Sequence, residues 1–299
     1  QALLTDGNAE SKVGQGVTLD VIGESTSVAP RDGLPDAKDS WTNFTGYWQA
    51  LGVKGISMNV ISEVSFQQLR LVSVGYNPGP ATLSQLDRMK ALAARSMEEG
   101  AWGLVARFES GGPEQPEEVI EVAKVVAKYD GIYVTHIGSE GAEQDRELDF
   151  AIRVAQEAKI PVHIFHLKIR GHENWGTIGK YLATIEAARS RGLDITANQY
   201  PYTAMQHGWS AFFPVWAREL GPQKFAAMLK DPAIRVSVKR EMATPTDKWE
   251  NFFVAARSPH PILLLGFKTE KLKSFIGKTL AEVAKLRGTS PEETAMDLV

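Results

Sequence analysis

The sequence predicts an α/β fold and, within that class, a (β/α)8 TIM-type barrel. Short apolar runs rich in β-branched residues alternate with amphipathic helical patterns along the 299 residues. Three successive runs begin near 101, 131 and 161, and this even spacing matches a βαβ unit of roughly 30 residues. The runs are apolar almost throughout, as expected of parallel strands that are buried on both faces. A doubly wound open sheet is the competing architecture, but no Gly-rich dinucleotide or phosphate loop follows any of the runs.

The elements follow one another in regular order. Strands are expected at 17–24, 55–61, 101–108, 131–136, 161–167 and 194–200. The clearest helix covers 82–99, where apolar residues recur every three or four positions. Thr82 is its predicted N-cap, with Gln85 three residues later, and Gly100 is its predicted C′ residue. Further helices are expected at 116–128, 146–159, 177–191 and 222–230.

The composition is that of an ordinary globular protein, with 43% hydrophobic and 23% charged residues and a net charge of −3. No dense Lys/Arg run is present, which argues against a nucleic acid or an anionic membrane as partner. The absence of cysteine excludes disulfides, thiolate nucleophiles and Cys-ligated zinc. The sequence contains no apolar run of about 18 residues, which is the length that would indicate a membrane span. We expect residues 1–299 to form one barrel domain, the central part of a longer chain, because the first residue is not Met.

Two histidines are the strongest candidates for chemistry. His136 and His166 lie at the C-terminal ends of successive predicted strands, one structural repeat apart. Adjacent parallel strands lie about 4.8 Å apart, so two imidazoles at matching heights could hold one metal ion on the face where barrels build their sites. Either histidine could instead be a hydrogen-bonded structural residue. His163 should point to the opposite face, toward a helix, because strand side chains alternate.

Three further residues lie at strand ends on the same predicted rim. Glu24 closes the strand at 17–24, and a carboxylate beside imidazoles suits zinc, although it could equally pair with a loop cation. Lys168 shares a face with His166, where it either binds a carboxylate or is a solvated loop residue. Tyr200 precedes a proline and is held extended, either to orient a substrate or to cap the core. Weaker candidates follow other strands: Arg70, Arg107, Glu140 and Trp175.

Several motifs, in order along nearly the whole chain, resemble the N-acyl-D-amino-acid deacylase (D-aminoacylase) family of the metal-dependent amidohydrolase superfamily. They include Gly16-Val-Thr-Leu-Asp-Val-Ile-Gly23, Gly100-Ala-Trp-Gly-Leu104, Tyr133-Val-Thr-His-Ile-Gly-Ser-Glu-Gly141, Phe165-His-Leu-Lys168, Asn174-Trp-Gly176, Gln199-Tyr-Pro-Tyr-Thr-Ala204 and Gly277-Lys-Thr-Leu-Ala-Glu-Val283. The resemblance implies an amidohydrolase-type barrel that holds one or two Zn2+ ions, with a small accessory β-domain. It makes His136 and His166 the paired metal ligands and places Lys168 and Tyr200 at the substrate carboxylate.

The chain also departs from the family pattern. The family's His-x-His on the first barrel strand would lie before Gln1, and its catalytic Asp, the general base, beyond Val299. The chain should therefore lack the first and last strands and the accessory β-domain. Where many members carry a metal-bridging cysteine, this chain reads Glu24-Ser25-Thr26, which makes Glu24 the candidate bridging ligand. The usual Arg two residues after the first histidine is Gly138.

The resulting hypothesis is zinc-dependent hydrolysis of a non-peptide C–N bond. An N-acyl-(D-)amino acid would be cleaved by metal-activated water to a carboxylate and a free amino acid. The expected partner is a small N-acyl amino acid or related amide, and a homo-oligomer is left open. Two alternatives stand beside it: another amidohydrolase reaction on a cyclic amide, dipeptide or carbamoyl substrate, and a catalytically inactive barrel that only binds a ligand. A Ser triad has no support, because no Gly-x-Ser-x-Gly motif occurs.

Overall fold

The computed structural model describes residues 2–24, 26–34, 41–75, 77, 79–108, 115–138, 140–141, 144–246, 249 and 251–299. The chain divides into two compact units, 1–201 and 202–299, and each is described here by itself. The single barrel domain expected over 1–299 stays a prediction. None of the described helices is long and apolar enough to cross a membrane.

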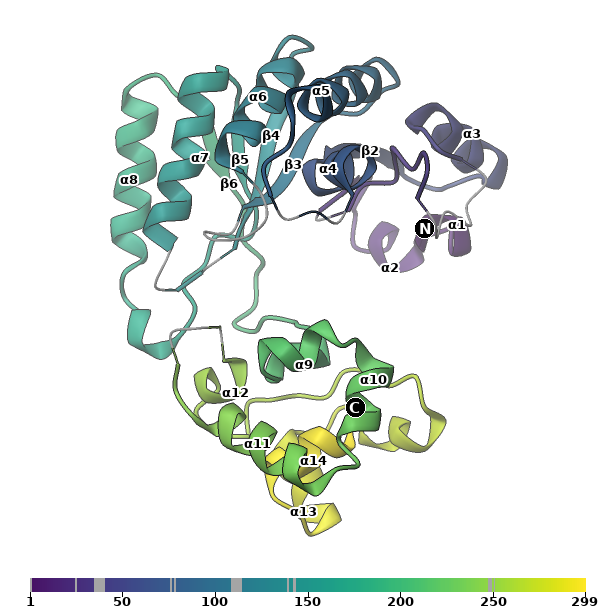
Figure 1. Cartoon of the computed structure of the whole chain (residues 1–299). Helices are drawn as coiled ribbons and strands as arrows, with labels where there is room; N and C mark the ends of the chain where they lie inside the picture. The colour runs from purple at the N-terminus through teal and green to yellow at the C-terminus, as the bar shows by residue number, and fades with distance from the viewer. Residues whose placement is uncertain are drawn as a thin grey trace. The chain divides into compact units, whose positions relative to one another are not determined.

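The first unit is built on one parallel sheet whose strand order equals the chain order (Figure 1). Its strands are β1 (Leu19–Ile22), β2 (Asn59–Ser65), β3 (Gly103–Phe108), β4 (Ile132–Ile137), β5 (Val162–Ile164) and β6 (Ile195–Ala197). Every neighbouring pair is parallel. A doubly wound sheet reverses its strand order at a switch point. The unbroken order therefore confirms the barrel-type α/β fold, here as six consecutive strands.

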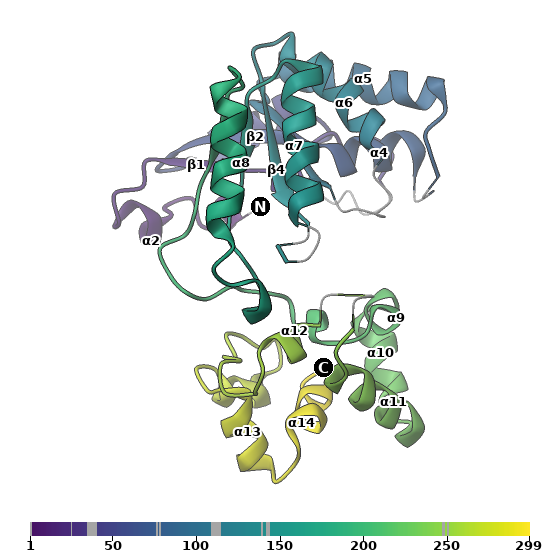
Figure 2. The same ribbon diagram turned by 90° about the vertical axis from the view of Figure 1, so that its left-hand side faces the viewer.

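Helices cover the outer face of this sheet, as Figures 1 and 2 both show. They are α5 (Leu83–Glu98), α6 (Pro116–Ala127), α7 (Gln144–Ala158) and α8 (Ile178–Ser190). Each lies within two residues of its predicted bounds. The capping box of α5 is formed as expected, because Thr82 accepts from the Gln85 backbone and Gln85 accepts from the Thr82 backbone. The amphipathic pattern therefore placed these helices correctly.

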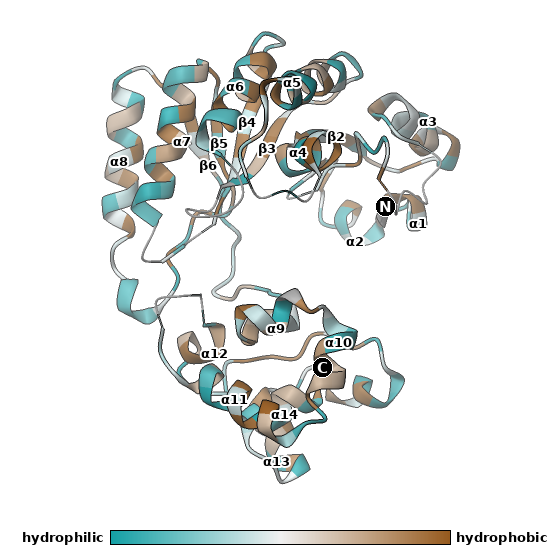
Figure 3. Ribbon diagram, in the orientation of Figure 1, coloured by the Kyte–Doolittle hydropathy of each residue, from teal (hydrophilic) through white to brown (hydrophobic). Residues whose placement is uncertain are grey.

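The main core lies between the sheet and these helices, where Figure 3 shows brown helix faces turned toward the strands. Alternate strand residues belong to this core: Leu104, Ala106, Tyr133, Ile137, Val162 and Ile164. Because side chains alternate along a strand, the intervening residues point to the inner side of the sheet. Arg107, His136 and His163 are among them.

The second strand differs from its prediction. It was expected at 55–61 but runs from Asn59 to Ser65. Gly55, with φ +73°, ends the helix α3 (Phe44–Lys54), so the apolar residues just after it form a connection instead. Ser62, Glu63 and Ser65 are fully buried polar residues, and their polarity concealed the strand. The helix α4 (Phe66–Val74), which Ser65 caps, was likewise not expected.

The remaining elements of the first unit are short. They are α1 (Ala2–Thr5), α2 (Glu10–Val13) and a 3-10 turn at His172–Asn174. A small second core lies beneath α1 and α3 and contains Leu3, Trp41, Tyr47, Leu51 and Met58. Strands β5 and β6 are shorter than expected, ending at Ile164 and Ala197, so His166, Lys168 and Tyr200 lie on loops that follow the strands.

The second unit is helical and has its own core. Its helices are α9 (Val215–Glu219), α10 (Pro222–Met228), α11 (Pro232–Ala243), α12 (Phe252–Ala255), α13 (Leu280–Arg287) and α14 (Pro291–Asp297). Two 3-10 segments, Trp209–Phe212 and Glu270–Phe275, complete it. Phe213, Phe225, Val238, Leu280 and Met296 are central in its core. The predicted helix at 222–230 corresponds to α10.

Candidate metal centre

His136 lies one residue before the end of β4, on the inner side of the sheet. Its neighbour Ile137 is buried in the outer core, so the His136 imidazole points the other way. In register it stands opposite Arg107 of β3. This is the C-terminal end of the strand, where the sequence placed it.

His166 reaches the same side by a turn rather than by strand alternation. Strand β5 ends at Ile164, and His166 adopts φ +38°, in the left-handed region. The backbone N–H of His166 donates to the side-chain oxygen of Asn198 (2.5 Å), and the N–H of Leu167 donates to the Asn198 carbonyl (2.9 Å). These bonds to the loop after β6 hold the turn in place.

The turn overturns the expectation for His163. Val162 and Ile164 face the helices, so His163 faces inward, on the same side as His166. Its Nδ1 lies 2.8 Å from Thr196 Oγ1 on the neighbouring strand. The prediction was wrong because it assumed that the strand stays extended as far as residue 166. The turn after Ile164 instead brings the His166 side chain to the same side of the sheet as His163.

Glu24, His136 and His166 lie close together. The Nδ1 atom of His136 lies 2.9 Å from Nε2 of His166. Oε1 of Glu24 lies 3.3 Å from the former atom and 3.1 Å from the latter. Within the described part of the chain, these residues form the one group of three or more that could hold a metal ion. Ser25, beside Glu24, lies outside the described residues.

The three donors fit a zinc ion. Tetrahedral zinc with bonds of about 2.0–2.2 Å keeps its ligand atoms about 3.4 Å apart. The separations of 2.9 to 3.3 Å are close to this value. Two imidazole nitrogens with one carboxylate oxygen are also a donor set that zinc accepts.

The carboxylates and imidazoles of the site shift one another's pKa values. Hydrogen bonds from His136 and His166 hold the pKa of Glu24 far below its usual range, outweighing the effect of burial. Burial by itself lowers the pKa of His166, but hydrogen bonds to Glu140 and Glu24 outweigh it and raise that pKa to about 9. The two carboxylates therefore stabilise positive charge at the imidazoles, and a metal ion that bound there would displace the proton of His166.

Glu140 is the residue whose importance the sequence understated. Its side chain is buried, with 4% exposure, and its Oε1 lies 3.3 Å from Nδ1 of His166. The other nitrogen of that ring, Nε2, faces Glu24 and His136. A carboxylate on the far nitrogen fixes the ring of a metal-binding histidine. The available signal was a carboxylate four residues after His136, in the loop that follows the same strand.

Lys168 and Tyr200 also lie at His166. The Lys168 ammonium forms an ion pair with Glu140 and lies 3.0 Å from His166 Nδ1. It also sits 5.3 Å from the centre of the Tyr200 ring, which is itself 6.3 Å from the His166 ring. Burial raises the pKa of Glu140, but its hydrogen bonds to His166 and Lys168 outweigh this and lower it. The predicted substrate-binding role of Lys168 and Tyr200 stays a prediction.

The weaker candidates from the sequence lie in different environments. Arg70 is buried on α4 and pairs with Glu118 at 2.5 Å, which indicates a structural role. Trp175 is exposed and its ring centre lies 3.7 Å from that of His172. Arg107 is exposed at the end of β3, beside His136.

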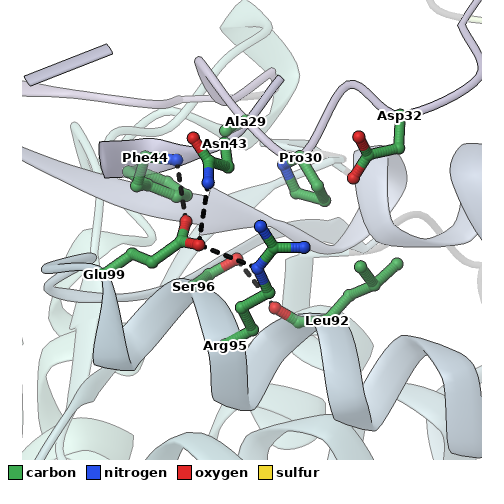
Figure 4. A pocket seen from close by; sticks show the side chains of 9 residues that line it. All are labelled: Ala29, Pro30, Asp32, Asn43, Phe44, Leu92, Arg95, Ser96 and Glu99. Carbon is green, nitrogen blue, oxygen red and sulfur yellow. Dashed lines mark hydrogen bonds and ion pairs between the residues drawn. The ribbon is translucent and has the colours of Figure 1, made fainter. Parts of the chain in front are cut away.

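A small pocket elsewhere in the first unit contains none of these site residues (Figure 4). It lies between the start of α3 and the end of α5. Glu99 accepts hydrogen bonds there from the side chain of Asn43 (3.0 Å), the backbone of Phe44 (3.0 Å) and Arg95 (2.8 Å). Glu99 thus already supplies the negative charge that the N-terminus of α3 favours, and the pocket is structural.

Comparison with known proteins supports the family that the motifs indicate. The chain is 30% identical over 192 residues to a D-aminoacylase of Alcaligenes xylosoxydans xylosoxydans, covering 63% of this chain and 40% of that protein. It is 27% identical over 205 residues to an N-acyl-D-glutamate deacylase of the same organism, covering 64% and 42%. The resemblance to the D-aminoacylase family is confirmed. No protein-family model matches the chain.

Solved structures agree on the fold. A D-aminoacylase crystal structure superposes with a TM-score of 0.68 at 24% identity, covering 99% of this chain and 56% of that one. An N-acyl-D-glutamate deacylase from Bordetella bronchiseptica, complexed with zinc and a phosphonate inhibitor, gives 0.67 at 19% identity and the same coverage. The chain thus spans about half the length of these D-aminoacylase relatives.

Proposed function

We propose that the protein is a metal-dependent amidohydrolase that cleaves the amide bond of an N-acyl amino acid. The observation that carries the proposal is the convergence of Glu24, His136 and His166 at the C-terminal ends of three parallel strands. These residues would hold one or two Zn2+ ions. Glu24 lies against both histidines and would supply the carboxylate ligand beside them.

The residues of the site would have different roles in this reaction. When bound, zinc supplies a Lewis acid for the amide carbonyl and lowers the pKa of water. Glu140 orients the His166 ring through Nδ1 and leaves Nε2 directed at the metal position. The relatives named D-aminoacylase and N-acyl-D-glutamate deacylase support an N-acyl-D-amino acid as substrate.

The deciding experiment is zinc content per chain in the native protein that contains this sequence. His136→Ala and His166→Ala should each lose zinc while remaining folded, because each removes one of three donors. His163→Ala is the matched control, since it lies on the same side of the sheet but bonds Thr196 instead. Its zinc content should equal that of the wild type.

Activity completes the test. The zinc-loaded protein should release free amino acid from N-acetyl-D-amino acids, and a chelator should abolish the release. Hydrolysis that persists without metal would contradict the mechanism. A folded protein that takes up no zinc even when it is supplied would instead support a barrel that only binds a ligand.

A further inference from the structure

The second unit carries a sulfur atom and an imidazole side by side on its surface. Met205 and His207 lie on the exposed segment 202–208, which has no regular secondary structure. The Nε2 atom of His207 lies 3.4 Å from the Sδ atom of Met205. Methionine is among the residues most often buried, yet Met205 is 40% exposed and belongs to none of the described cores. Core packing therefore does not account for this methionine.

The imidazole of His207 rests on a fixed support. Its ring centre lies 4.0 Å from that of Phe252, the first residue of α12, and the two planes are inclined by 39°. Phe252 is buried, and Asn251 before it caps the helix by accepting from two backbone N–H groups, both at 3.1 Å. The stacked ring directs its Nε2 atom at Met205. The two donor atoms are therefore held close together before any ligand binds.

A thioether beside an imidazole is a donor pair for a soft metal ion. Calcium and magnesium take oxygen ligands, and zinc is bound by thiolates, imidazoles and carboxylates. Thioether sulfur instead selects Cu+, which imidazole also binds. The chain contains no cysteine, so none of its own thiolates competes for such an ion.

The separation of the two atoms suits one ion. Cu+ has the same filled d shell as Zn2+, whose tetrahedral sites have bonds of about 2.3 Å to sulfur and about 2.0 Å to nitrogen and so keep these atoms about 3.5 Å apart. The observed separation is 3.4 Å. One ion can therefore bind both side chains where they lie, with the imidazole proton on Nδ1.

We propose that Met205 and His207 bind Cu+ as a second metal site of this chain. Water or a small ligand from solution takes the remaining coordination positions, and no change of oxidation state is involved. The site shares no residue with the group of Glu24, His136 and His166. It is independent of the proposed function.

The test titrates Cu+ into the native protein under anaerobic conditions, with excess zinc present, in competition with a chromophoric Cu+ chelator. Met205→Leu and His207→Phe should each lower the Cu+ affinity at least about tenfold, because even a residue that only orients a metal ligand is worth about 10- to 100-fold. Leucine keeps the volume of methionine, and phenylalanine keeps a ring to stack on Phe252. His260→Phe removes another exposed histidine of the second unit and should bind Cu+ like the wild type.

X-ray absorption at the copper edge identifies the ligands. Copper in the wild type should have a sulfur neighbour, and Met205→Leu should lose it. Copper bound at the first metal centre would have no sulfur neighbour, since Glu24, His136 and His166 offer only oxygen and nitrogen.

Three results would overturn the proposal: copper without a sulfur neighbour in the wild type, a sulfur neighbour that remains in Met205→Leu, and equal Cu+ affinity in the wild type and either variant. Failure of the proposed function has a different signature. It would appear as absent zinc or absent hydrolysis and would leave these copper measurements unchanged.

Discussion

Glu63 is the most unusual single residue of the inner face of the sheet. It lies on β2 with no exposed surface, and no donor from another described residue reaches either of its carboxyl oxygens. In the register of the sheet, Glu63 lies opposite Gly103 of β3. Gly23 also lies close to it, since a Cβ atom added to Gly23 would be 2.9 Å from Oε2 of Glu63. Burial raises its pKa from 4.5 to about 7, with the charge of Glu24 contributing.

Stability should therefore fall as the pH rises past the ordinary range of a glutamate. The folded chain keeps a proton that the unfolded chain releases, so the free energy of unfolding decreases between pH 4.5 and about 7. The full decrease is about 3 kcal/mol. Glu63→Gln should remove this part of the pH dependence and leave the part that comes from the raised pKa of His166, as urea unfolding at pH 5 and pH 8 in the presence of a chelator would show. Glu10→Gln, exposed on α2, is the control, and equal pH dependence in both variants would contradict the assignment.

Glu140 should control metal affinity without touching the metal. Glu140→Gln removes the charge that orients His166 through Nδ1, and loss of such a partner weakens metal binding about 10- to 100-fold. Competition with a chromophoric chelator measures this affinity. Glu173→Gln, on the exposed loop after β5, should bind zinc like the wild type. Equal affinity in the two variants would show that Glu140 does not orient His166.

At the scale of elements, a buried ion pair joins two helices of the outer layer. Arg70 on α4 pairs with Glu118 on α6, and both side chains are less than 8% exposed. Arg70 also donates to the carbonyls of Asn77 and Gly79, and Glu118 accepts from the Ala81 backbone at 2.6 Å. The pair thereby fixes the connection between α4 and α5.

Breaking this pair from one side should be costly. Arg70→Met leaves the Glu118 charge buried without a partner, and such changes cost about 3–5 kcal/mol of unfolding free energy. The double variant Arg70→Met/Glu118→Gln should recover part of the loss, because it removes the isolated charge and keeps an acceptor for Ala81. Urea unfolding of the three chains measures both effects. A single variant as stable as the wild type would show that the pair contributes little.

At the scale of the whole molecule, each of the two units has its own core. The predicted site residues all belong to the first unit, residues 1–201. The segment that follows it, 202–208, is exposed and has no regular secondary structure. Tyr202 within it is 62% exposed.

Limited proteolysis should therefore cut the chain at this boundary first. Brief treatment with chymotrypsin should cleave after Tyr202 and release two stable fragments, because exposed segments outside helices and strands are preferred sites of nicking. Tyr129, 39% exposed at the end of α6, is the internal comparison and should be cut later. Intact-mass spectrometry identifies the first products. Earlier cleavage within the first 201 residues would contradict the division into two units.

Much of the fold was predictable because the information is local. The four outer helices carry their apolar residues at helical intervals, and the strands from 101 onward are apolar runs at even spacing. The second strand was misplaced because buried Ser62 and Glu63 carry no hydropathy signal. The helix α4 was missed because it follows that strand without a break.

The sequence by itself determined the barrel-type order of strands and helices, and it identified Glu24, His136 and His166 as metal ligand candidates. Only the tertiary structure decided how they meet. Glu24 and His166 are 142 residues apart, and their approach depends on the twist and register of the sheet between them. The inward turn at His166, with its φ of +38°, depends on bonds to Asn198, which lies on the loop after β6. Periodicity reports which face of an element is buried, but contacts between side chains of different elements follow from packing, which no local pattern encodes.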